Sequence, residues 1–133
     1  AVGFQSLYAN TTGTDNVAVG SQALDGNTTA SQNVAVGKNA LGGSNTGSFN
    51  TAVGHEALIS NTTGNPNTAI GANALDANTT GGSNTAVGKD ALGVNITGGS
   101  NTAVGRCSLQ ANLGNSNTGL GAYALQTNTT GTI

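Results

Sequence analysis

Apolar and polar positions along this chain repeat every seventeen residues. Residues 84–88 read NTAVG, the same pentapeptide occupies 50–54 and 101–105, and closely related ones occupy 16–20, 33–37 and 67–71. The consensus unit is A-V-G-x-x-A-L-x-x-N-T-T-G-x-x-N-T, numbered below from its first Ala. Because self-similarity at a fixed period is the signature of repeat architectures, each unit is expected to form one structural rung.

The repeats fill the chain in eight units, with nothing left over that resembles a second domain. One unit is a residue short, near 112–114. We therefore predict a single repeat array over 1–133, cut from a longer fibrous protein because it does not begin with Met. The third place is always glycine, and we expect these turn glycines to have positive φ. They are Gly3 and then Gly20, Gly37, Gly54, Gly71, Gly88, Gly105 and Gly121.

Seventeen residues are too few for the common two-helix repeats, and Gly and Asn-Thr-Thr-Gly would interrupt a helix in every unit. Two short strands and two turns fit, with a second set of turn glycines, also expected at positive φ, at the thirteenth place. The fold class predicted is therefore all-β: a parallel β-solenoid, or β-roll, of about eight coils that stack at about 4.8 Å.

Alternation within N-T-A-V predicts that Val and the preceding Val/Thr point inward while Ala and Asn point outward. In the second predicted strand, Leu points inward and Ala outward. Residues at one place in successive units form a row along the solenoid, here called a rank. The predicted core ranks are Val19, Leu24, Val36, Leu41, Val53, Leu58, Ile70, Leu75, Val87, Leu92, Val104 and Leu109.

The outward assignment makes a rank of alanines at the first place conspicuous. An exposed strand position should vary freely, so an unbroken row of small residues suggests a face pressed against another chain. The alternative is a turn so tight that only Ala fits. The predicted oligomer face is Ala18, Ala35, Ala52, Ala69, Ala86 and Ala103.

Composition narrows the functional classes. Only 6% of the 133 residues are charged and the net charge is −2, which provides no basic patch for nucleic acid or an anionic membrane. No apolar run is long enough to span a bilayer. Three Lys or Arg residues, scattered along the chain, argue against a polysaccharide lyase on a β-helix.

The repeats resemble the head repeats of trimeric autotransporter adhesins of the YadA type. NVAVG at 16–20 and NTAIG at 67–71 are similar to the short strands of that family, and the match recurs along the whole chain. The A-L-x-x-N-T-T-G half departs from the usual shorter adhesin unit and looks like arrays in phage tail fibres and large bacterial surface fibres. The resemblance implies a left-handed, trimeric, extracellular β-roll on a cell or virion surface, with no catalytic residues.

Several features imitate chemical sites. The loop at 98–101 lacks the Lys and the following helix of a phosphate loop, so it is interpreted as a turn. His55 and Glu56 are expected to be solvated turn residues. The aspartates occupy different places in the unit, so neither a metal nor a cofactor is predicted. Cys107, at the fifth place, is expected to be exposed.

The Asn-Thr-Thr segments admit two interpretations. Six asparagines are followed by x-Thr and form N-glycosylation sequons: Asn10, Asn27, Asn61, Asn78, Asn95 and Asn128. An amide ladder along the rod explains the one-per-coil spacing without a sugar and is favoured.

The function predicted is a non-enzymatic structural or adhesive module of an extracellular fibre. Its expected partners are copies of itself, as a homotrimer or a head-to-tail filament joined through open end coils, and a host surface or matrix. The alternative is ice binding by ranks of Thr. Ice-binding solenoids typically present Thr-x-Thr on one face, whereas Thr11 and Thr12 are neighbours in a turn.

Overall fold

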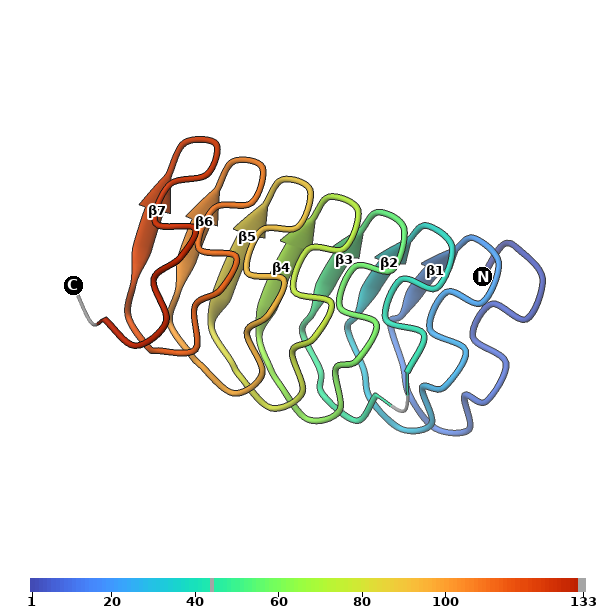
Figure 1. Cartoon of the computed structure of the whole chain (residues 1–133). Coiled ribbons are helices and arrows are strands. Elements are labelled where there is room, and N and C mark those ends of the chain that lie inside the picture. The colour runs from blue at the N-terminus through green and yellow to red at the C-terminus, as the bar shows by residue number, and fades with distance from the viewer. Residues whose placement is uncertain (44, 132–133) are drawn as a thin grey trace.

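The computed structural model is an all-β solenoid, and it describes residues 1–43 and 45–131. Seven short parallel strands lie side by side along one wall, in sequence order (Figure 1). They are β1 (Val17–Val19), β2 (Val34–Val36), β3 (Thr51–Val53), β4 (Asn67–Ile70), β5 (Asn84–Val87), β6 (Thr102–Val104) and β7 (Thr118–Leu120). The predicted fold class is confirmed.

Every strand pairs with the same place in the next unit. Ala18 lies opposite Ala35 and Ala69 opposite Ala86. The last pairing, Ala103 with Gly119, keeps the same places although the missing residue shortens the separation in sequence to sixteen. The seven strands delimit six complete turns, fewer than the eight units of the sequence. The first unit contributes only an isolated bridge between Val2 and Val19, and the last continues beyond β7.

The prediction of a second strand in each unit, at the Ala-Leu segment, is wrong. The Ala-Leu segment is instead a chain of turns in which non-glycine residues adopt left-handed backbone angles. Gln22 has φ 58° and Leu24 has φ 52°, and the same pair of angles recurs at Asn73 and Leu75. The backbone thereby bends sharply twice within three residues, which closes a seventeen-residue coil without a second sheet.

The interior of each coil is narrow and is filled by Leu and two alanines. The Leu half of the predicted core is confirmed, because all six of these side chains are fully buried. Ala at the first and sixth places is also buried, as at Ala69 and Ala74. The predicted orientation of N-T-A-V is therefore reversed, with Ala and Asn inside and the flanking Val and Thr outside.

The last strand shows why only small residues fit at the first place. A Cβ built on Gly119 would lie 2.6 Å from Ser108 Oγ and 3.0 Å from Leu109 Cγ. Ser108 replaces the usual Ala at the sixth place, and its hydroxyl donates to the Gly119 carbonyl oxygen at 3.0 Å. The first place thus packs directly against the sixth and seventh places across the coil, so a Val inside would collide with Leu.

The third-place glycines have positive φ as predicted, between 116° at Gly121 and 139° at Gly71. The prediction for the thirteenth place is wrong, because those glycines do not have positive φ. They are required by close stacking instead: a Cβ on Gly64 would lie 2.4 Å from the Gly81 carbonyl oxygen.

Two ladders of buried asparagine complete the interior. In the predicted ladder, at the tenth place, the Asn78 amide donates to Asn61 Oδ1 at 3.0 Å and to the Gly81 carbonyl oxygen at 3.0 Å. The sixteenth place forms a second ladder that the outward assignment missed. There the backbone N–H of each Asn donates to the side-chain oxygen of the previous one, as from Asn84 to Asn67 at 3.0 Å.

No helix within the described ranges has the length and hydropathy needed to cross a bilayer.

Candidate functional site

The most extensive candidate surface is the outward side of the sheet, which we call the outer face. It consists of the seventeenth and second places of successive units on β1–β7 and is visible as one row of strands in Figure 1. The second-place residues were predicted to be core but are exposed or half-buried, with Val19 39% and Ile70 40% exposed. The second-place rank comprises Val19, Val36, Val53, Ile70, Val87, Val104 and Leu120.

The neighbouring rank of the outer face changes character along the rod. It is Val17 and Val34 on β1 and β2, and threonine from β3 onward. The threonines are Thr51, Thr68, Thr85, Thr102 and Thr118. Their hydroxyls make no hydrogen bond to any of the described residues, and no charged side chain interrupts either rank. The outer face is thus an uncharged stripe of methyl and hydroxyl groups.

The alanine rank does not form an oligomer face. Ala18 is 1% exposed, and Ala35, Ala52, Ala69, Ala86 and Ala103 are 0% exposed within the single chain. The expectation that these small residues are pressed against something is confirmed, but the contact is the Leu rank of the same chain. The predicted interface at these residues is therefore wrong.

The threonines of the Asn-Thr-Thr segments are used differently from those of the outer face. At the eleventh place, Thr62 Oγ1 donates to the Thr79 carbonyl oxygen at 2.9 Å, and Thr79 Oγ1 donates to the Ile96 carbonyl oxygen at 3.1 Å. Their hydroxyls therefore hold one coil to the next. They are not directed to an external ligand.

Burial decides against sugar attachment at the internal sequons. Asn27, Asn61, Asn78 and Asn95 are at most 1% exposed, and their amide nitrogens donate hydrogen bonds inside the coil. A glycosyl group on such a nitrogen would have to occupy the packed interior. The amide-ladder interpretation is confirmed for these four.

The Lys, Arg and His side chains are aligned in space rather than scattered. Lys38, His55, Lys89 and Arg106 all occupy the fourth place and are exposed along one edge. The acidic neighbours Glu56 and Asp90, at the fifth place, pair with His55 at 3.7 Å and with Lys89. Comparing places within the unit would have revealed this alignment in the sequence. Among the described residues these neighbours assemble no nucleophile, and no group of three or more His, Cys, Asp or Glu side chains could hold a metal ion.

His55 is exposed as predicted, whereas Glu56 is half-buried between amides of the adjacent coils. Its carboxylate oxygens accept from Asn39 Nδ2 at 3.5 Å and from Asn73 Nδ2 at 3.4 Å. Cys107, in the same rank, is 6% exposed, so its predicted exposure is wrong. Its thiol lies 3.9 Å from Asp90 Oδ2, between the coils that carry Asp90 and Tyr123.

Comparison of the chain with protein-family models, curated proteins and solved structures found no match in any of the three.

Proposed function

We propose that this chain is a non-enzymatic structural module of an extracellular fibre, either the head of a surface adhesin or the shaft of a tail fibre. The observation that carries the proposal is the outer face, an uncharged stripe along all seven strands of a coil whose interior is already filled. The stripe is not needed to close the core of the single chain. An exposed row of Val, Ile and Leu side chains left outside a completed core is typical of an interaction site.

Copies of the same chain are the partner that this face fits best. Its ranks repeat at the spacing of adjacent parallel strands, about 4.8 Å, so a partner must repeat at that spacing to remain in contact along the rod. A second solenoid satisfies this condition over its whole length, whereas a globular protein meets it only locally. The family resemblance favours three chains around one axis, with the outer faces turned inward.

Charge substitution on the outer face tests the proposal. In the double variant Ile70→Lys, Val87→Lys, two ammonium groups per chain would be buried at the interface, so we expect a folded monomer in light scattering and circular dichroism. The control Thr80→Lys, Thr97→Lys adds the same charge at exposed turn positions on the same two coils and should keep the oligomer. If both variants have the mass of the wild type, the outer face is not the interface.

Ice binding is the second candidate, and the five outward threonines of β3–β7 favour it. They place one hydroxyl per coil beside a row of second-place methyl groups. Both candidate functions need the outer face. If partner chains cover this face, it is no longer accessible to ice. Thermal hysteresis from a monomeric sample, abolished in Thr68→Lys, Thr85→Lys, would support ice binding over assembly.

A further inference from the structure

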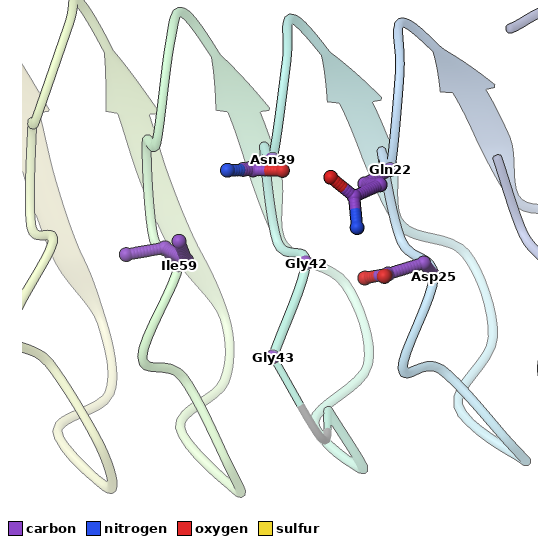
Figure 2. A pocket seen from close by; sticks show the side chains of 6 residues that line it. All are labelled: Gln22, Asp25, Asn39, Gly42, Gly43 and Ile59. Atoms are coloured by element: carbon purple, nitrogen blue, oxygen red, sulfur yellow. The ribbon is translucent and has the colours of Figure 1, made fainter. Parts of the chain in front are cut away.

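A depression interrupts the side wall of the solenoid away from the outer face, beside Gly42 and Gly43 (Figure 2). Its volume is about 270 Å³, and it is lined by Gln22, Asp25, Asn39, Gly42, Gly43 and Ile59. At the eighth place the flanking coils carry Asp25 and Ile59, whereas this coil has only the hydrogen of Gly42. The depression therefore exists because two consecutive glycines remove the side chains that cover this wall elsewhere.

The backbone at this point also departs from the regular pattern. Between most coils, the N–H of the ninth place donates to the carbonyl oxygen of the eighth place on the next coil, as from Ala9 to Asp25 at 3.0 Å and from Ser60 to Asp76 at 3.2 Å. The corresponding bond is missing in two places, from Gly26 to Gly42 and from Ala77 to Gly93, and in both the eighth place of the acceptor coil is glycine. Within the part of the chain that the structure describes, the carbonyl oxygen of Gly42, which lines the depression, therefore lacks a protein donor.

The side chains around the depression add further unused polar groups. Those of Gln22 and Asp25 extend from one coil toward Gly42 on the next (Figure 2). Neither makes a hydrogen bond to another described residue. Asn39 uses only its Nδ2, in the 3.5 Å bond to Glu56, and its oxygen is turned toward Gln22 (Figure 2). One carboxylate, two amides and the peptide carbonyl of Gly42 thus lie around a single small space.

We propose that this depression is a binding site for one sugar ring of a glycan. Sugar hydroxyls are both donors and acceptors, which matches this mixture of carboxylate, amide and peptide groups. The volume lies just below the range of about 300–1,000 Å³ typical of pockets for drug-sized ligands. A single pyranose is therefore the appropriate size, with the Asp25 carboxylate and the Gln22 amide directed at adjacent hydroxyls.

A calcium ion alone fits less well. Calcium requires six to eight oxygen ligands, and tight sites use several carboxylates, whereas this depression contains only that of Asp25. The inference rests on the proposed function: if the chain is a fibre module that contacts a host surface, a sugar site would let the module bind a glycan of that surface. The side wall and the outer face are separate, so sugar binding and self-association can be measured independently.

The test is a nuclear magnetic resonance titration of the whole chain with methyl glycosides of glucose, galactose, mannose and N-acetylglucosamine. We expect at least one of them to bind with a Kd on the order of 1 mM, as its size implies. Saturable amide shifts should be confined to Gln22, Gly26, Asn39, Gly42 and Gly43. Asp25→Asn keeps the shape and removes the charged acceptor, so the Kd should increase about tenfold. Asp76→Asn, at the same place three coils away, is the matched control and should leave the Kd unchanged.

Three results would overturn the inference. The first is no saturable shift with any of the four glycosides. The second is shifts at these glycines with calcium chloride alone and not with sugars, which would assign the site to a cation. The third is equal loss of binding in Asp25→Asn and Asp76→Asn. Light scattering on the same samples separates this failure from that of the fibre proposal, because a lost sugar site leaves the oligomeric mass unchanged.

Discussion

Glycine at the third place of an internal coil satisfies two separate requirements. Gly71 has φ 139°, and a Cβ there would lie 2.5 Å from the Gly88 carbonyl oxygen on the next coil. Gly121 has φ 116°, but a Cβ there would meet nothing within 4 Å. The two positions therefore separate the backbone requirement from the stacking requirement.

We expect Gly71→Ala to destabilise the fold by about 2–4 kcal/mol, since backbone strain and a backbone collision add. Gly121→Ala should cost only the strain, about 1 kcal/mol. Thermal melting followed by circular dichroism measures both. Equal melting temperatures for the two variants would contradict the proposed role of stacking.

Asp76 introduces a pH dependence. Burial raises the pKa of its carboxyl above the ordinary value of 3.8, and the nearby Asp90 carboxylate adds to the increase. Hydrogen bonds from its own backbone, Asn73 and Ala77 oppose it. Because the folded state holds this proton more tightly than the unfolded state, ionisation of Asp76 weakens the fold.

Wild-type protein should therefore gain stability relative to Asp76→Asn as the pH falls through the raised pKa, and the gain should be complete below 3.8. Urea unfolding of the two proteins at a series of pH values measures the difference. A difference that stays constant between neutral pH and pH 3.8, or that changes in the opposite direction, would contradict this assignment.

The sequence predicts the residues of the interior better than it predicts which way they point. The Leu rank, the third-place glycines and the first Asn ladder follow from their fixed places in the unit. Alternation defines two faces of N-T-A-V but does not identify which of them points inward. Val53, with its larger apolar side chain, is a more obvious core residue than Ala52. The rule that apolar residues are buried works in one direction only, because folded proteins leave much apolar surface exposed. The width of the coil, which decides the matter, depends on the left-handed angles at Glu56 and Leu58.

At the scale of the element, one coil shows the effect of a missing residue. In regular coils the Asn amide of the first ladder donates to a carbonyl three residues later, as from Asn95 to Gly98. In the short unit Asn112 donates to Gly114, only two residues later. Asn95 Oδ1, which should accept from the next ladder amide, is left buried without a partner. The position of this break follows from the sequence, but the orphaned oxygen required the structure.

Restoring the residue should repair the ladder. Insertion of one Thr between Leu113 and Gly114 recreates the seventeen-residue spacing and allows Asn112 to donate to Asn95 Oδ1. We expect a gain of about 1–3 kcal/mol, the cost of leaving a buried polar group unsatisfied, seen as a higher melting temperature. The matched control is one Thr inserted between Thr63 and Gly64, which lengthens a regular unit and should lower the melting temperature. If the two insertions have the same effect, the broken ladder is not a weak point.

For the whole molecule, the constant register places the seventeenth and second places of every unit on the same side, so the outer face runs without interruption from β1 to β7. Two adjacent residues of β4 show the different roles of the inner and outer sides of the sheet. Ala69 faces the filled interior and Ile70 the exterior. A large polar residue at Ala69 should unfold the coil, whereas one at Ile70 should leave it folded and affect only association.

The mass of the unmodified chain in solution tests the central claim most directly. Light scattering at micromolar concentration should give three times the chain mass of 12.8 kDa if the outer faces pack together. Multiples of that value would indicate head-to-tail stacking of such trimers. A folded chain that remains at 12.8 kDa across this concentration range would contradict the proposal that the outer face is an assembly surface.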